Sequence, residues 1–174
     1  FHAANSAAML RDQRTWYDAV RPGLLLYGVV PPPLKSLLPV KPVMSLRSRV
    51  VAVKGMRTGE STGYGANFVA SRPMRIAVIP AGYADGLDLR LAGKAAVLVR
   101  GQRSLILSVS MDSAVIDVSR VEVSPGDPVV LVGEQGKEHI DTRELAGLIG
   151  TVPHEILCRT GIRIARVYEP ASFE

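Results

Sequence analysis

The pattern of hydrophobic and polar positions changes once along the chain. Residues 6–18 place helix-forming Ala, Met and Leu beside polar positions, which predicts a helix with Ser6 as its N-cap. The apolar run 24–30 is bounded by Gly23 and three prolines, which predicts a short buried strand. A helix followed by a buried strand is one α/β unit, so residues 1–30 are predicted to form such a unit.

A proline-rich segment, residues 31–42, separates this unit from the rest and is predicted to be a stiff linker. Residues 43–174 then alternate apolar and polar positions in short runs punctuated by glycine-containing turns. Strands of this length and spacing are typical of a small β-barrel or sandwich. The chain is therefore predicted to be mostly β.

One helix interrupts the predicted strands. Asp141 precedes Glu144 by three residues, which is a capping-box arrangement, and Gly150 is suited to the end of the helix. These signals predict a short helix over residues 141–150. Residues 161–169 are predicted to form a final strand.

Composition narrows the classes of protein to consider. The hydrophobic content of 47% and charged content of 21% are typical of globular proteins. No apolar run reaches the ~18 residues that a membrane-spanning helix needs. Cys158 is the only cysteine, so no internal disulfide is expected and a reducing compartment is favoured. The chain begins at Phe1 inside a helix-forming stretch, which suggests a fragment.

The net charge of +5 does not indicate a nucleic-acid partner, because the basic residues are scattered and form no dense run. A generally basic surface is the favoured interpretation. The three histidines, at positions 2, 139 and 154, are too scattered for a metal triad, and no phosphate-binding glycine loop of the usual spacing occurs. A metal site is therefore not expected.

Two short motifs near the start are candidates for binding an anion. Asn5 and Ser6 lie at a loop-to-helix junction, where side chains and backbone N–H groups can hold a phosphate. Arg21 precedes Gly23, which permits close approach of the backbone to a ligand. The simpler interpretations are a helix cap and a surface arginine, and taken alone each is favoured.

Three further motifs carry candidate chemistry. Tyr64 lies between two glycines, and a tyrosine can act as a general acid or base when neighbours lower its pKa of about 10. Tyr83 lies in a glycine-rich turn, and Met111 and Asp112 follow a predicted strand. On spacing alone, packing on a turn explains Tyr64 at least as well, and a structural turn is the default for Tyr83. Spacing does not separate a binding role of Met111 and Asp112 from an ordinary strand end.

The order of the motifs is more informative than any one of them. The chain reads HAANS, RPG, GYGANF, IPAGYADG, VSMD, GTVPHEIL and a final IR-x-x-R-x-Y. In this order they resemble alanine racemase over nearly the whole chain. The resemblance implies that residues 1–30 are the end of a TIM barrel that binds pyridoxal 5'-phosphate. It also implies that residues 43–174 are the family's C-terminal β-barrel-like domain.

The resemblance further implies a role for each candidate residue. Asn5 and Ser6, with the backbone of Gly23 and Leu24, would hold the cofactor phosphate. Arg21 would face the pyridine nitrogen.

The other candidates would act on the substrate. Tyr64 would be the base that removes the Cα proton of the L-enantiomer, while the family's cofactor-holding lysine serves the opposite face. Met111 would offer its backbone N–H to the substrate carboxylate, and Tyr83 and Asp112 would line or support the substrate entry. In the family the tyrosine reaches the active site of the other protomer of a head-to-tail homodimer.

The expected activity is interconversion of L- and D-alanine for peptidoglycan synthesis in the bacterial cytoplasm. The lysine and most of the barrel are not in this chain, so the chain alone is expected to be inactive. Two other interpretations stay open, a racemase for serine or another small amino acid and a non-catalytic β binding module.

Several positions differ from the family pattern. Ile162 stands where some members have a phosphate-binding tyrosine, and His154 stands where tyrosine is common. Leu107 and Ser108 replace a Gly-Arg pair. Arg90 falls one position later than the usual arginine, so it is not assigned a role at the entry.

Overall fold

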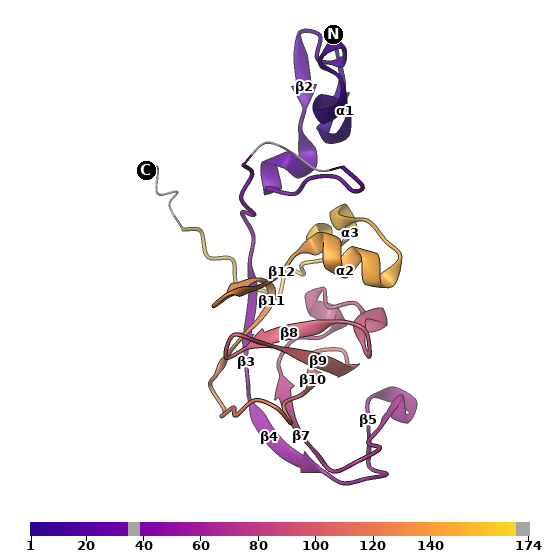
Figure 1. The fold of residues 1–174 in the computed structure, drawn as a ribbon, viewed down its shortest axis with the longest axis vertical. Helices are drawn as coiled ribbons and strands as arrows, with labels where there is room; N and C mark the ends of the chain where they lie inside the picture. Colours follow the sequence, from indigo (N-terminus) through magenta and orange to yellow (C-terminus); the bar gives the residue numbers. More distant parts are fainter. Residues whose placement is uncertain (35–38, 170–174) are drawn as a thin grey trace.

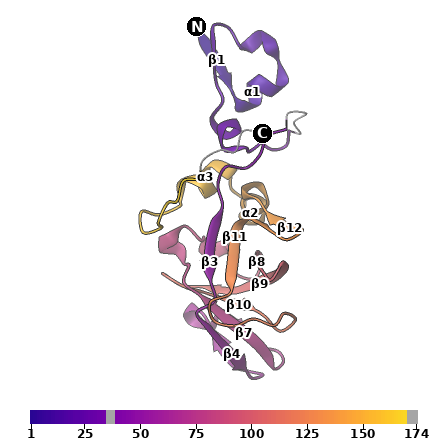
Figure 2. The same ribbon diagram turned by 90° about the vertical axis from the view of Figure 1, so that its left-hand side faces the viewer.

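The computed structural model describes residues 1–34 and 39–169. Its N-terminal unit begins with a strand, β1 (His2–Asn5), followed by helix α1 (Ser6–Arg11) and a 3-10 helix, Gln13–Thr15. Strand β2 (Ala19–Arg21) returns parallel to β1. A strand–helix–strand unit with parallel strands is the repeating element of α/β folds. In Figures 1 and 2 this unit lies at one end of the molecule.

The predicted helix 6–18 is shorter than expected, and its cap differs. The α-helix ends at Arg11. Asn5 is the N-cap, because its Oδ1 accepts hydrogen bonds from the backbone N–H groups of Ala7 and Ala8 at 3.1 and 3.0 Å. The prediction that Ser6 caps the helix was therefore wrong, and Ser6 is instead buried.

The predicted strand 24–30 was also wrong. A 3-10 helix, Gly23–Tyr27, occupies this run and ends at Gly28 in the left-handed region, with φ of 69°. A Cβ at Gly28 would lie 1.8 Å from the carbonyl oxygen of Lys41, so only glycine lets the two backbones pass. Residues 31–34 and 39–42 form neither helix nor strand, and the rest of the predicted linker lies outside the described residues.

As predicted, the remaining chain is mostly β, and its strands pair in antiparallel fashion. In the described part of the chain, eight strands form one sheet, seven of them in the order β12-β11-β8-β9-β10-β7-β4 and the eighth, β3, paired with β11. Their bounds are β3 (Leu46–Arg49), β4 (Ala52–Met56), β7 (Met74–Ile79), β8 (Ala96–Val99), β9 (Gln102–Val109), β10 (Ala114–Asp117), β11 (Pro128–Gln135) and β12 (Glu138–Ile140).

The sheet curls because two consecutive strands lie near its two ends. Strand β3 pairs with β11 near one end, whereas β4, only a few residues later, pairs with β7 at the other. The chain from β3 to β4 thus draws the ends together into a barrel-like shape (Figures 1 and 2). A fully buried core fills this shape, with Ile79, Val97, Ile116 and Val129 each at 0% exposure. Burial of each such side chain stabilises the fold by about 1.5–3 kcal/mol.

A small hairpin projects from the end of the sheet that carries β4 and β7. Strands β5 (Ser61–Thr62) and β6 (Phe68–Val69) pair with each other and enclose a 3-10 helix, Tyr64–Ala66. A second apolar cluster, Met56, Ala70, Ile76 and Leu107, with Phe68 packed against it, joins this hairpin to the sheet. The hairpin is therefore fixed to the sheet by its own core.

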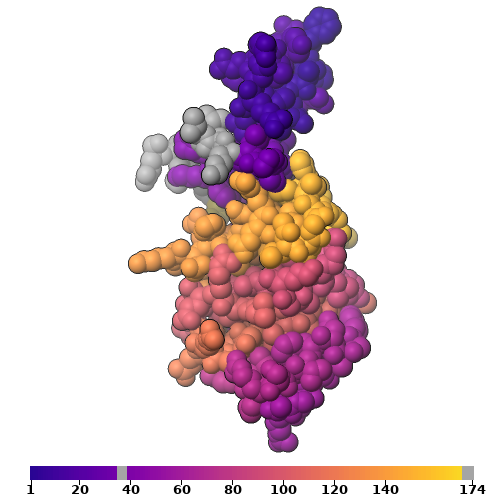
Figure 3. Space-filling view, turned by 45° about the vertical axis from the view of Figure 1, so that its right-hand side comes forward, coloured from indigo at the N-terminus to yellow at the C-terminus, as the bar shows by residue number. Residues whose placement is uncertain are grey.

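Two helices lie at the other end of the sheet, between it and the N-terminal unit (Figures 1 and 3). Helix α2 (Thr142–Ile149) confirms the predicted helix, because Asp141 accepts a 2.7 Å hydrogen bond from the backbone N–H of Glu144 and Gly150 ends the helix in the left-handed region. Helix α3 (Pro153–Cys158) was not predicted.

The predicted final strand over 161–169 is wrong, because these residues form turns and irregular structure. No helix among the described residues is both long enough and apolar enough to cross a membrane.

Candidate active site

The first group of candidate residues gathers where the parallel strands β1 and β2 end. Asn5 and Arg21 are partners in the register of this pair. Because parallel strands finish at the same edge, the residues that follow them, Ser6 and Gly23, also come together there. A Cβ at Gly23 would lie 3.7 Å from Ser6 Oγ, and Leu24 is buried beside them.

Hydrogen bonds hold this group, which we call the strand-end cluster. Ser6 Oγ donates to the carbonyl oxygen of Pro22 and accepts from the backbone N–H of Leu25 at 3.3 Å. Arg21 donates from Nη2 to the carbonyl oxygen of Ala3 at 2.9 Å and is otherwise exposed. Among the described residues the Asn5 amide nitrogen donates to no acceptor. The cluster thus presents a guanidinium, an amide N–H₂ and a hydroxyl, which suits an anion.

Tyr64 is presented by a tight loop in the β5–β6 hairpin. Gly63, Gly65 and Ala66 all have positive φ, of 83°, 62° and 53°. Glycine adopts this left-handed region readily, whereas Ala66 is strained there. The loop leaves the Tyr64 side chain 57% exposed, so it projects from the surface of this chain.

Tyr83 and Met111 are carried by two segments that are locked together. The backbone N–H of Tyr83 donates to the carbonyl oxygen of Ser110 at 3.0 Å, and that of Ala84 donates to Met111 at 2.9 Å. A Cβ at Gly82 would lie 2.4 Å from the Met111 carbonyl, so the two backbones can approach only because position 82 is glycine. The position of Tyr83 therefore follows that of Met111.

The loop that carries Tyr64 lies beside the two segments that carry Tyr83 and Asp112. Interaction with the neighbouring Tyr64 hydroxyl raises the pKa of Tyr83 above its ordinary value. Partial burial and the negative charge of Asp112 raise the pKa of Tyr83 further. Tyr83 therefore keeps its proton to high pH and can donate it in a hydrogen bond to Tyr64 Oη. We call Tyr64, Tyr83, Met111 and Asp112 the tyrosine cluster.

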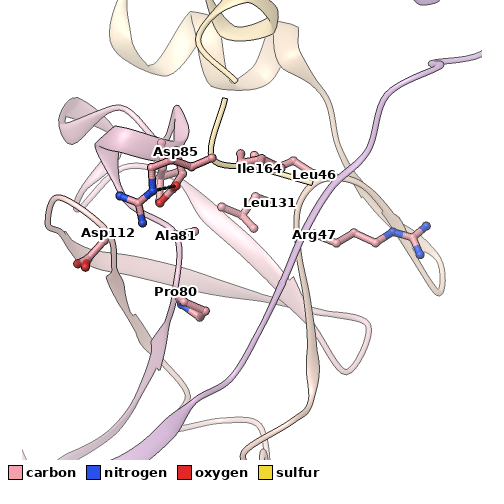
Figure 4. A pocket seen from close by; sticks show the side chains of 10 residues that line it. Leu46, Arg47, Pro80, Ala81, Asp85, Asp112, Leu131 and Ile164 are labelled. Carbon is pink, nitrogen blue, oxygen red and sulfur yellow. Dashed lines mark ion pairs between the residues drawn. The ribbon is translucent and has the colours of Figure 1, made fainter. Parts of the chain in front are cut away.

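A pocket of about 360 Å³ lies next to this cluster. Its lining includes Pro80, Leu131 and Asp112, and at one side Asp85 Oδ1 pairs with Arg163 Nε at 3.6 Å. Figure 4 shows Asp85 on the pocket wall, whereas the side chain of Arg47 points away. The sequence predicts a turn at Asp85 but gives no signal that links it to Arg163, so this pair was missed.

The positions that differ from the family pattern have clear places in the fold. Arg90 is bound to Asp88 and to the carbonyl oxygen of Ile149, so it does not join the tyrosine cluster. Leu107 and Ser108 are buried, at 3% and 1% exposure. Ile162 is exposed, and so is His154.

The strand-end cluster and the tyrosine cluster do not meet within the chain. In Figure 1 α2 and α3 lie between the N-terminal unit and the β5–β6 hairpin, and in Figure 2 they lie between that unit and strands β4 and β7. A site that uses both clusters therefore cannot be built from one copy in this arrangement.

Comparison with known proteins adds a family relationship. A family model described as the C-terminal domain of alanine racemase matches residues 43–168. A protein named alanine racemase from Carboxydothermus hydrogenoformans is 42% identical over 171 residues. The match covers 96% of this chain but 46% of that protein, so this chain spans less than half of its relative's length.

Solved structures agree with this relationship. The alanine racemase of a D-cycloserine-producing Streptomyces lavendulae is similar with a TM-score of 0.92 and 34% identity, over 98% of this chain and 46% of that one. The alanine racemase of Bartonella henselae, solved with covalently bound pyridoxal phosphate, has a TM-score of 0.86 and 34% identity, over 95% of this chain and 46% of that one.

Proposed function

Because this chain belongs to the alanine racemase family, we propose that it forms the C-terminal part of a pyridoxal-phosphate enzyme that interconverts L- and D-alanine. The observation that carries this proposal is the meeting of Tyr64, Tyr83, Met111 and Asp112 from three separate segments. A proton-transferring phenol beside a backbone that can bind a carboxylate suits an amino-acid substrate. The names of the relatives favour alanine over serine.

The strand-end cluster fits pyridoxal 5'-phosphate. The space beside Ser6 Oγ that a Cβ at Gly23 would fill is left open, so an anion can approach the backbone there. Asn5, Ser6 and the backbone of Gly23 and Leu24 would hold the phosphate, once the Ser6 hydroxyl turns away from its present acceptor. The cofactor supplies an electron sink that acidifies the Cα–H bond of the substrate.

Arg21 would face the pyridine nitrogen of the cofactor. A guanidinium holds its protons at every physiological pH, so Arg21 can donate a hydrogen bond there without handing a proton over. We propose that this restrains electron withdrawal and favours return of a proton to Cα over side reactions. The 2.9 Å hydrogen bond from Arg21 to the Ala3 carbonyl helps to orient the guanidinium.

The tyrosine cluster would carry the proton transfer on one face of the substrate. Tyr64 Oη would take the Cα proton of L-alanine and return a proton when D-alanine is converted. Tyr83, whose raised pKa keeps its hydroxyl protonated, would donate a hydrogen bond that steadies Tyr64 Oη. Met111 would offer its backbone N–H to the substrate carboxylate, and Asp112 would line the substrate entry with Tyr83.

We further propose a head-to-tail homodimer. The separation of the two clusters within one chain supports an arrangement in which Tyr64 of each copy serves the strand-end cluster of the other. The exposed side chains of Tyr64 and Met111, at 57% and 53%, would then be covered by the partner. We also propose that the substrate is a small amino acid and that the enzyme acts in the bacterial cytoplasm. Its product, D-alanine, would supply peptidoglycan synthesis.

The test is a substitution in the full-length protein that contains this chain. Tyr64→Phe removes the hydroxyl and keeps the ring, so racemisation of alanine is expected to fall by about a hundredfold or more. Tyr168→Phe is the matched control, because Tyr168 is 86% exposed and lies outside both clusters. Full activity in Tyr64→Phe would refute the role of this residue, and a clear preference of the parent enzyme for serine would refute the substrate.

A further inference from the structure

We propose that Ser108 is a positioning residue for Tyr64, acting through the hydroxyl of Thr62. The inference rests on the proposed role of Tyr64 and deepens it. Thr62 immediately precedes the Gly63–Ala66 loop, and its Oγ1 lies 3.3 Å from Ser108 Oγ. This hydrogen bond joins the start of the loop to the long strand β9, to which Ser108 belongs.

The second contact is steric. A Cβ added to Gly63 would lie 2.7 Å from the Cβ of Ser108, which is closer than side chains tolerate. The backbone of Gly63 therefore rests directly on Ser108, one residue before Tyr64. The consecutive residues Thr62 and Gly63 thus both contact Ser108, and together these contacts fix the position of the loop on the sheet.

A β-bulge in β9 explains why Ser108 is available for this contact. In the pairing of β9 with β10, Val115 is opposite Ser108, but Ile116 is opposite Ile106, so Leu107 is the additional residue. Leu107 belongs to the small apolar cluster beneath the hairpin, and Ser108 lies under the loop. Successive residues of a regular strand point to opposite faces, whereas here both contact the hairpin.

The same strand also leads to the second tyrosine. Two residues after Ser108, the carbonyl oxygen of Ser110 accepts the hydrogen bond from the backbone N–H of Tyr83. Ser108 thus supports the backbone beside Tyr64, and the segment that follows β9 holds the backbone of Tyr83, whose hydroxyl lies near that of Tyr64. Ser108 is 1% exposed and uncharged, so its effect on Tyr64 is one of position.

The experiment uses Ser108→Ala, Thr62→Val and the double variant in the full-length enzyme. Each single change removes one hydroxyl of the pair and keeps the local volume nearly constant. Ser104→Ala is the matched control, because Ser104 is a buried serine on the same strand, paired with Val97 and remote from the hairpin. The first readout is amide hydrogen exchange of residues 61–69, which needs no catalysis.

Exchange in the hairpin is expected to be roughly fivefold faster in each single variant, as the loss of one neutral hydrogen bond implies. The double variant should be no faster than either single one, because both changes break the same bond. The Ser104→Ala enzyme should exchange like the parent.

The second readout is the deuterium isotope effect at Cα, which distinguishes position from general stability. A displaced Tyr64 slows proton removal from L-alanine, so the isotope effect with L-[2-²H]alanine should rise in Ser108→Ala. With D-[2-²H]alanine the isotope effect should fall, because the other face removes that deuteron and the Tyr64 step becomes more limiting. A structural defect alone would lower the rate without this asymmetry.

The two proposals fail in different ways. Unchanged hairpin exchange and unchanged isotope effects in Ser108→Ala overturn the positioning role while leaving Tyr64 as the base. Full activity in Tyr64→Phe overturns the catalytic role, and the exchange measurement then still decides whether Ser108 holds the loop.

Discussion

Asp88 is a buried carboxylate, paired with two arginines, at the end of the sheet near α2 and α3. The carboxylate is 5% exposed and accepts hydrogen bonds from Arg90, at 2.7 Å from Nη2 and 2.8 Å from the backbone N–H. It also pairs with Arg159 at the end of α3. Hydrogen bonding by Arg90, followed by the charge of Arg159, lowers the pKa of Asp88 from 3.8 to about 2 against the opposing effect of burial.

The lowered pKa of Asp88 determines how much this carboxylate adds to the free energy of unfolding and over which pH range. A pKa lowered in the folded state adds stability above the unfolded pKa, and the stability is lost as the pH falls through the folded pKa. The difference between 3.8 and about 2 corresponds to about 2 kcal/mol near neutral pH. Roughly half of that free energy should remain at about pH 3, and little below the folded pKa of Asp88.

The substitution Asp88→Asn should therefore lower the free energy of unfolding by about 2 kcal/mol near neutral pH, and the deficit should shrink in acid. Urea unfolding followed by far-ultraviolet circular dichroism is the suitable assay. The single tryptophan, Trp16, lies in the N-terminal unit, so its fluorescence would not report on the sheet.

Glu138→Gln is the control, because it removes a carboxylate from an exposed pair with Arg103 and should cost less than about 1 kcal/mol. A deficit for Asp88→Asn that is as small as the control, or that does not shrink below about pH 4, would refute the electrostatic reasoning.

Three further predictions test packing and hydrogen bonding elsewhere. Gly161→Ala should destabilise the fold by more than about 1 kcal/mol, because its Cβ would lie 2.6 Å from the carbonyl oxygen of Ala84. Gly147→Ala, in an open part of α2, should instead stabilise the fold by about 0.5–1 kcal/mol. Equal Tm values for the two variants would contradict this prediction. Thr142→Val should be neutral or stabilising in urea unfolding, since Thr142 Oγ1 is buried and has no hydrogen-bond partner among the described residues, and a loss above about 1 kcal/mol would show that the hydroxyl is satisfied. Tyr83→Phe should lower kcat/KM for alanine roughly tenfold in the full-length enzyme through loss of the donor to Tyr64, and an unchanged kcat/KM would show that the donor is not needed.

The sequence predicted an element correctly where the residues that determine it lie within that element. Asp141 and Gly150 predicted α2 because cap and terminator act within the helix itself. The apolar run 24–30 was misread as a strand because the tight passage of Gly28 past Lys41 depends on a residue near the far end of the linker. Residues 161–169 have strand composition, yet Gly161 fits against the backbone of Ala84, and no short-range pattern reveals that contact.

The candidate site, too, was predicted only in part. The order of motifs suggested Tyr64, Tyr83, Met111 and Asp112 as a group, and the structure brings these four residues together. The support from Ser108 could not be predicted, because it depends on a bulge that exists only in the pairing of β9 with β10. Contacts between strands far apart in the sequence are decided by the packed sheet, not by spacing.

The separation of the two clusters within one chain has a genetic consequence under the proposed dimer. A protomer that lacks Tyr64 and a protomer that lacks Arg21 would each be inactive when paired with itself. In a mixed dimer, however, both lesions fall in the same one of the two sites, and the other site is assembled entirely from intact residues. Two defective alleles expressed in one cell would therefore complement each other, and D-alanine auxotrophy would be relieved.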